Sequence, residues 1–152
     1  MRNLKIEELF LGAYVCVFRD GMMSAPMRVT DIRGDGCVIL EGVEGIVSVS
    51  LRDICPVQMD EGVMRGFRFH PTKGDNVWMK QRGDIRLTVA LKWKGGIQQC
   101  RRCAISGRTA CWNEEIRYVH ELQRWWNDRV YFPFDVEMEL EWKGVPEKIE
   151  EL

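Results

Sequence analysis

The sequence lacks the features on which most function classes depend. It has only two histidines among 152 residues, which leaves little imidazole for acid–base catalysis. No apolar run approaches the roughly 20 residues of a membrane-spanning helix. The carboxylates of Glu7 and Glu8 interrupt the stretch in which a secretory signal needs apolar residues. A net charge of −1 excludes a strong overall attraction to nucleic acid or to membranes. We therefore expect a cytoplasmic protein that does not bind membranes.

The composition is that of a folded globular protein. Hydrophobic residues make up 45% and charged residues 30% of a chain that is long enough for one ordinary domain or two small ones. A chain of this length buries enough apolar surface to fold without disulfides. We expect its cysteines to be reduced and mostly buried as small hydrophobic residues. They are Cys16, Cys37, Cys55, Cys100, Cys103 and Cys111.

The first third of the chain consists of short alternating runs separated by turns. Asp20-Gly21 and Asp35-Gly36 lie between such runs, and an Asp-Gly pair favours a type I′ turn because both of its central residues need a positive φ. The pattern predicts strands over residues 13–19, 27–32, 37–40 and 46–51. Four or five short strands in so few residues indicate a small N-terminal barrel of the Src-homology-3 type, over residues 1–57.

The remaining residues, 58–152, predict an antiparallel sheet and one helix. A short helix begins near residue 59 and ends at Gly66, and strands follow over residues 85–93 and 97–105. Asn113 is a suitable N-cap for a helix over residues 114–127. Carboxylates alternate with apolar residues over 135–142, which predicts an acidic final strand. The fold class is therefore α+β, mostly β, with a meander packed against the C-terminal helix.

A basic sheet face is the first candidate site. Residues 80–108 carry eight basic side chains and one acidic one, a net charge of +7, whereas residues 135–152 carry seven acidic and two basic ones, a net charge of −5. A three-residue turn at Arg82-Gly83-Asp84 would place Lys80 opposite Arg86 and put the basic residues on one face with an aromatic ring. Such a face can bind single-stranded nucleic acid, or the acidic segment can neutralise it within the fold. The candidate residues are Trp78, Lys80, Arg86, Lys92 and Arg101.

Catalytic motifs are missing from the sequence. His120-Glu121-Leu122-Gln123-Arg124 begins like a zinc-protease helix, but Arg124 stands where the second histidine would be needed. The sequence has no Gly-x-Ser-x-Gly elbow and no phosphate-binding P-loop. We therefore expect a protein that is not an enzyme and has no cofactor.

A zinc site is a weaker interpretation of the late cysteines. Cys100, Cys103, Cys111 and His120 have the ligand types of a structural zinc site. Residues three apart on a strand point to opposite faces of the sheet, however, and this geometry disfavours Cys100 and Cys103 as ligands of one ion. A turn at Gly95-Gly96 would place Cys100 on the side of Leu91 and Cys103 on the side of Thr88. We expect thiols that serve packing and no bound metal.

The helix over residues 114–127 supplies the second candidate site. Trp125 and Trp126 are adjacent, so one face of a helix cannot bury both rings completely, and tryptophan is common at protein interfaces. Together with His120 they predict a surface for a protein partner or for a second copy of the chain.

Three stretches resemble one protein family. Residues 6–15 resemble its opening, and Pro56-Val57-Gln58-Met59-Asp60-Glu61 followed by Gly66-Phe67 resembles its middle segment. Residues 115–123 are similar to a late helix that reads I-[KR]-Y-V-H-[EQ]-L-Q. The family consists of small proteins encoded in gut Bacteroidetes genomes, often in prophage or mobile-element neighbourhoods. The resemblance implies an architecture and a context, and it supplies no activity, cofactor or catalytic residue.

The leading functional prediction is a non-enzymatic interaction protein of a phage or mobile element, which binds another protein or itself. The alternative is a nucleic-acid-binding accessory protein that uses the basic sheet face.

Overall fold

The chain folds into two compact units, which we describe separately. A computed structural model describes residues 3–72, 76–94, 97–107, 111–131 and 140–145, leaving out the side chains of residues 92–94, 97–101, 111, 113 and 131. The first unit contains residues 1–58 together with 118–123, and the second contains 59–117 and 124–152. A short segment of the late helix therefore belongs to the first unit.

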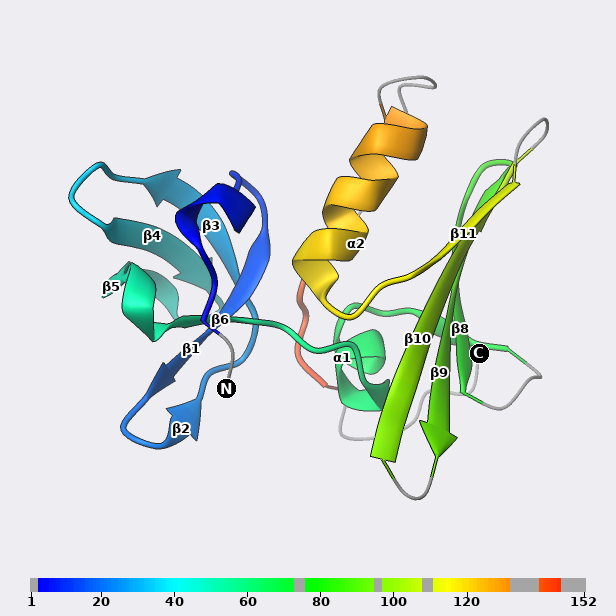
Figure 1. Ribbon diagram of the computed structural model, residues 1–152, viewed down its shortest axis with the longest axis horizontal. Helices are drawn as coiled ribbons and strands as arrows, with labels where there is room; N and C mark the ends of the chain where they lie inside the picture. The colour runs from blue at the N-terminus through cyan, green and yellow to red at the C-terminus, as the bar shows by residue number, and fades with distance from the viewer. Residues whose placement is uncertain (1–2, 73–75, 95–96, 108–110, 132–139, 146–152) are drawn as a thin grey trace. The chain divides into compact units, whose positions relative to one another are not determined.

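The first unit is a curled antiparallel sheet of six strands (Figure 1). The strands follow the order β2-β1-β3-β4-β5, and β6 pairs with β1. One turn of 3-10 helix, η1 at Ile6–Glu8, precedes β1, and a second, η2 at Leu51–Asp53, lies between β5 and β6. The strands are β1 (Tyr14–Arg19), β2 (Met22–Met23), β3 (Met27–Ile32), β4 (Cys37–Gly42), β5 (Gly45–Ser50) and β6 (Ile54–Pro56). The four strands predicted from alternation are confirmed as β1, β3, β4 and β5.

The first turn shows how the sequence specifies the sheet. Asp20 and Gly21 have φ values of 55° and 74°, so both central residues of the β1–β2 turn take the left-handed conformation that a type I′ turn requires. Asp is one of the few residues besides glycine that tolerate this conformation, which confirms the prediction made from the Asp-Gly pair.

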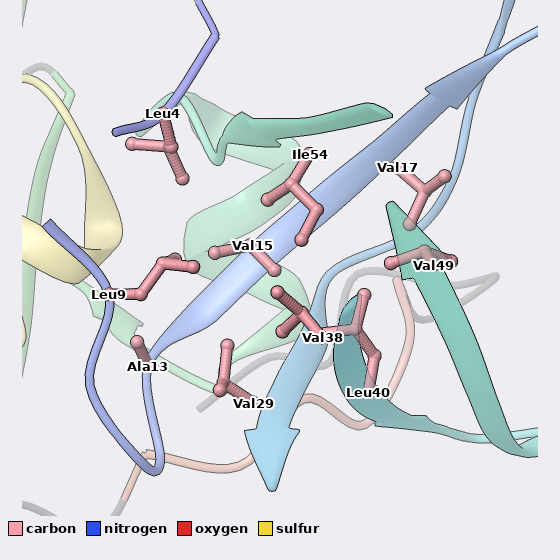
Figure 2. Packing of buried hydrophobic residues seen from close by; sticks show 10 residues of the cluster. All are labelled: Leu4, Leu9, Ala13, Val15, Val17, Val29, Val38, Leu40, Val49 and Ile54. Carbon is pink, nitrogen blue, oxygen red and sulfur yellow. The ribbon is translucent and has the colours of Figure 1, made fainter. Parts of the chain in front are cut away.

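The core of the first unit is aliphatic. Val15 and Val17 of β1 pack with Val29, Val38 and other residues of the neighbouring strands (Figure 2). Alternate residues of one strand share a face, so these odd-numbered positions of β1 point into the core while Tyr14, Cys16 and Phe18 point to the opposite face.

The second unit is built on a five-stranded antiparallel sheet with the order β11-β10-β9-β8-β7 (Figure 1). Its strands are β7 (His70–Pro71), β8 (Val77–Arg82), β9 (Ile85–Lys94), β10 (Ile97–Ser106) and β11 (Cys111–Glu115). Helix α1 spans Glu61–Gly66, and its N-cap Asp60 accepts a hydrogen bond from the Val63 N–H at 2.8 Å. The predicted short helix and its end at Gly66 are confirmed.

The late helix begins later than the sequence predicts. Cys111–Glu115 form β11, which pairs with β10, and helix α2 spans Val119–Trp126 before a turn of π-helix, η3 (Asn127–Tyr131). The proposed N-cap Asn113 is therefore a strand residue. The helix is capped instead by Glu121, whose carboxylate accepts from the Tyr118 N–H at 3.2 Å. This is half of a capping box, without the usual Ser or Thr at the N-cap.

Only the end of the predicted acidic strand, residues 140–142, lies within the described residues. Residues 135–139 lie outside the described residues, and 140–142 carry no strand. Trp142 packs its ring edge-on against Phe67 with centroids 5.1 Å apart, and Lys143 donates to the Gly66 carbonyl at 2.9 Å. This segment packs against the end of α1. Among the described residues, neither helix is long and apolar enough to cross a bilayer.

The two glycines of α1 provide a test of this packing. A Cβ atom at Gly66 would overlap the Trp142 ring, whereas one at Gly62 would meet only the Asp60 carboxylate at 3.4 Å. We expect Gly66→Ala to lower the free energy of unfolding by about 1–3 kcal/mol through overpacking. Gly62→Ala is the matched control and should raise it by about 0.5–1 kcal/mol, because alanine favours the helix. Chemical denaturation measures both, and equal effects would contradict the packing described here.

Candidate functional site

The register of the second sheet decides which residues share a face. Arg82 pairs with Ile85, so the turn has two residues and not three, and Lys80 pairs with Leu87 where the sequence analysis places Arg86. Gly83 has φ +60°, which lets the chain reverse within two residues. The prediction of a three-residue turn was therefore wrong. An error of one residue in the length of the turn moves every side chain of β8 to the other face of the sheet.

The corrected register divides the predicted basic face. Trp78 pairs with Val89 and Lys80 with Leu87, and both valine and leucine are buried. Arg86 pairs with Gln81, and both side chains are exposed on the opposite face. Trp78, Lys80 and Arg86 thus do not form one surface.

The other two predicted residues are located only by their backbones. A bulge between Gln98 and Cys100 shifts the β9–β10 register by one residue. Lys92 consequently pairs with Cys100, and Arg101 pairs with Leu91, beside which the sequence predicted Cys100. The side chains of Lys92 and Arg101 lie outside the described ones.

Trp78 is a core residue. Its ring is only 5% exposed, and the Arg65 guanidinium lies over it at 5.8 Å from the centroid. Lys80 likewise places its ammonium group 5.3 Å from the centroid of Phe69. The indole N–H of Trp78 is buried, and within the described part of the chain it finds no hydrogen-bond acceptor. The Trp78 side chain therefore presents no open surface on which a base could stack.

The opposite face of the second sheet carries mixed charge. Arg86 pairs with Ser106, and Arg102 pairs across β10 and β11 with Glu115. The side chains of Arg86, Arg102 and Glu115 are all exposed. A carboxylate therefore lies opposite one of the two arginines, which reduces the attraction of this face for an anionic polymer.

The predicted aromatic interaction surface is buried. Trp125 and Trp126 are 7% and 2% exposed, and His120 is 4% exposed. The expectation that adjacent tryptophans leave one ring at a partner contact was wrong, because the chain itself covers both rings. A protein partner needs another surface.

The polar residues of α2 attach the helix to the first unit. Gln123 accepts a hydrogen bond from the Tyr14 N–H and donates one to the Gly12 carbonyl, both at 2.9 Å. His120 places Nε2 3.7 Å from a carboxylate oxygen of Glu8 and stacks on Tyr118. Residues 116–123, which carry the family resemblance, therefore have a structural role, because they hold the start of α2 in the first unit. We call these contacts the clasp.

The backbone reinforces the clasp. Val119 donates to the Val57 carbonyl at 3.0 Å, and Met59 donates to the Arg117 carbonyl at 3.3 Å. Between them Gln58 and Tyr118 form an antiparallel bridge. The segments on either side of residues 58 and 118 therefore run antiparallel, which returns the start of α2 to the first unit.

The described cysteines are reduced and largely buried. Burial, and after it the nearby Glu114 carboxylate, raises the pKa of the Cys103 thiol to about 12. Cys103 pairs with Val89 on the buried face, where the sequence analysis placed Cys100. Cys100 pairs with Lys92, and the side chains of Cys100 and Cys111 lie outside the described ones. Among the described residues no three potential metal ligands come together.

Exposed large apolar side chains lie instead mostly on the first unit, and one group of them is at the β4–β5 hairpin. Val43 and Ile46 are 75% and 71% exposed, and Val47 is 39% exposed. Val47 takes a core-facing position opposite Leu40, at the rim of the sheet, whereas Ile46 lies on the outer face opposite Glu41. β5 pairs with β4 alone among the described strands and forms the end of the sheet order (Figure 1).

The open side of β5 carries alternate backbone groups. Leu51 donates to the Gly36 carbonyl at 3.0 Å immediately after β5, so the odd-numbered residues bond toward β4. Ile46 and Ser48 consequently direct their N–H and C=O groups away from the sheet. We call the strand Gly45–Ser50, with this open side, the β5 edge.

The sequence carries one signal of this edge, which is not among the sites predicted above. Natural edge strands are usually protected by a lysine, a proline, a bulge or very short length. β5 has none of these in its six residues, and its register to β4 has no shift. β2 and β6, at the other borders of the sheet, have only two and three residues.

Comparisons with known proteins found no match: no family model, no curated protein and no solved structure is significantly similar to this chain.

The Gln123 clasp can be tested by substitution. Gln123→Ala removes both hydrogen bonds and leaves the Tyr14 N–H and the Gly12 carbonyl without their partner, so we expect the free energy of unfolding to fall by about 1–3 kcal/mol. Gln123→Glu retains the acceptor for Tyr14 but loses the donor to Gly12. It should therefore also destabilise the protein, and full stability of the glutamate variant in denaturation experiments would contradict the second bond.

The core position of Trp78 predicts a contrast between two substitutions. Trp78→Ala should lower the free energy of unfolding by about 3–5 kcal/mol, the usual cost of emptying a large core site. Trp78→Phe keeps a ring and removes the buried N–H donor that has no acceptor among the described residues, so it should cost much less. Thermal or chemical denaturation compares the two variants. If Trp78 were instead exposed and stacked on nucleic-acid bases, Trp78→Ala would be nearly as stable as the native chain.

Proposed function

We propose that this protein is a non-enzymatic interaction protein that associates with a second copy of itself along the β5 edge. The observation that carries the proposal is a six-residue strand that pairs with β4 alone among the described strands and whose exposed side chains include Ile46 and, beside it, Val43. Open backbone groups on such an edge pair readily with another strand.

A second copy suits this edge because of its charges. The β4–β5 hairpin carries Glu41 and Glu44 and no basic residue, whereas exposed Arg52 follows the end of β5. In an antiparallel pairing about a two-fold axis, the acidic turn of each copy lies beside Arg52 of the other. The same symmetry places both Ile46 side chains on one face of the joined sheet.

This proposal keeps the class of function that the sequence predicts and moves its surface from α2 to β5. For residues 1–57 we propose a Src-homology-3-type barrel in an open form, since a closed barrel would leave no edge. A phage or mobile-element context, implied by the family resemblance, stays a prediction. Nucleic-acid binding also stays a prediction, now limited to the exposed face around Arg86.

The proposal is tested by measuring mass in solution against concentration. We expect the native chain to shift from monomer to dimer in sedimentation or light-scattering experiments. Ile46→Lys adds a charge to the edge, and Ser48→Pro removes an outward N–H without removing a bond to β4. Each should weaken the dimer by tenfold or more, which corresponds to about 1.4 kcal/mol.

Leu11→Lys is the matched control. Leu11 is 66% exposed and lies in the turn before β1, away from the β5 edge. The control should leave the dimer unchanged, and unaltered near-ultraviolet circular dichroism should show that all three variants are folded. A native chain that stays monomeric, or edge variants that associate as tightly as the native chain, would overturn the proposal.

A further inference from the structure

Two cysteines lie directly opposite each other in the first unit. Cys16 of β1 pairs with Cys55 of β6 in antiparallel register. Directly opposed residues of an antiparallel pair point to the same face, with Cα atoms about 4.5–5.5 Å apart. Disulfides form when the Cα atoms are about 4.4–6.8 Å apart, so the backbone needs no rearrangement to join these two residues.

The pair lies on the face of β1 opposite the aliphatic core. Val15 and Val17 flank Cys16 and belong to the core cluster, so the Cys16 side chain points to the other side of the sheet. Cys16 and Cys55 are nevertheless 6% and 1% exposed. Other side chains on that face must therefore cover Cys16 and Cys55.

Met23 provides part of the cover. Its thioether sulfur lies 3.2 Å from Sγ of Cys55, and the same thiol lies 3.6 Å from the carbonyl oxygen of Cys16. Met23 belongs to β2, a strand of only two residues, and Met23 itself is 46% exposed. Such a short, exposed strand opens more readily than the core of the sheet.

Contacts before and after the cysteine pair along β1 and β6 hold the two strands together. Val15 and Val17 pair with Pro56 and Ile54, and Arg19 forms an ion pair with Asp53 at 3.2 Å. The two thiols therefore stay opposite each other when β2 moves.

We infer that Cys16 and Cys55 form a redox-active dithiol, which peroxides oxidise to a cross-strand disulfide when Met23 and β2 open. One thiol loses its proton, and the thiolate attacks an oxygen of hydrogen peroxide. The O–O bond breaks, the hydroxide that leaves takes up a proton to become water, and a sulfenic acid remains on the sulfur. The second thiol then attacks this sulfur, the S–S bond forms and a second water leaves. Two electrons pass from the two thiols to the peroxide, which is reduced to two molecules of water.

The reaction depends on pH in a defined direction. Burial raises the pKa of the Cys55 thiol, so a smaller fraction is thiolate at neutral pH than for an exposed cysteine. Because the thiolate is the nucleophile, the oxidation rate should rise as the pH increases above neutral.

Peptide mapping after treatment with hydrogen peroxide tests the inference. Trypsin releases Cys16 in the peptide of residues 6–19, Cys55 in 53–65 and Cys37 in 34–52. We expect a linked pair of the peptides 6–19 and 53–65, within a monomer whose mass has fallen by two hydrogen atoms. Met23→Ala should raise the rate of linkage severalfold, because it removes the sulfur that covers Cys55.

Cys37→Ser is the matched control. Cys37 is half-buried on β4 and pairs with Ser50, not with another cysteine, so its replacement should leave the linkage intact. Cys55→Ser should abolish it. The native chain and Met23→Ala are sufficient for the test if Cys55→Ser does not fold. The inference would be overturned if disulfides formed only through Cys37 or only between molecules. It would also be overturned if Cys16 and Cys55 of the folded protein stayed reduced at a peroxide concentration that oxidises the unfolded chain.

Discussion

The period of two residues along a β-strand connects each candidate surface of this protein to the register of a neighbouring strand. A side chain takes one face or the other according to whether the turn before it has an even or an odd number of residues. In the second unit, the two-residue turn at Gly83 puts Trp78 with Val89 in the core and leaves Arg86 on the outer face. In the first unit, the register between β1 and β6 places two thiols opposite each other. The functional surfaces follow from these registers more directly than from composition.

The exposed apolar side chains of the β5 edge depend likewise on how the strands are arranged. Ser48 and Ser50 alternate with Val47 and Val49, a pattern typical of a strand with one buried face. Burial of Val47 is incomplete because no described strand lies beyond β5. The exposure of this residue therefore depends on the end of the strand order, which no local pattern encodes.

The segment around α2 shows a different relation between motif and role. Its histidine, glutamate and glutamine resemble parts of a catalytic or ligand-binding motif when they are considered as letters. In the structure Gln123 bonds to the backbone of β1 and of the turn before it, Glu121 caps the helix, and His120 lies buried beside Glu8. A recognisable polar motif can thus be a device that attaches a helix to a sheet.

Local structure was largely predictable from the sequence. Alternation located the strands β1, β3, β4, β5, β9 and β10, and the glycine at position 66 located the end of α1, because neighbouring residues determine these signals. The start of α2 was misplaced, since Asn113 and the two glutamates after it are suitable for a helix N-terminus but also pair well along an available strand edge. The candidate sites were not predictable in this way, because the bulge after Gln98 and the turn at Gly83 each shift a whole strand by one residue.

The sequence by itself determined the fold class, most of the elements and the near neutrality of the chain, all of which depend on composition and on residues close together along the chain. Only the tertiary structure decided that Trp78, Trp125 and Trp126 belong to the core, that β5 is an open edge and that Cys16 faces Cys55. The physical reason is that burial and pairing depend on residues distant in sequence, and a shift of one residue in register exchanges the buried face of a strand for the exposed one.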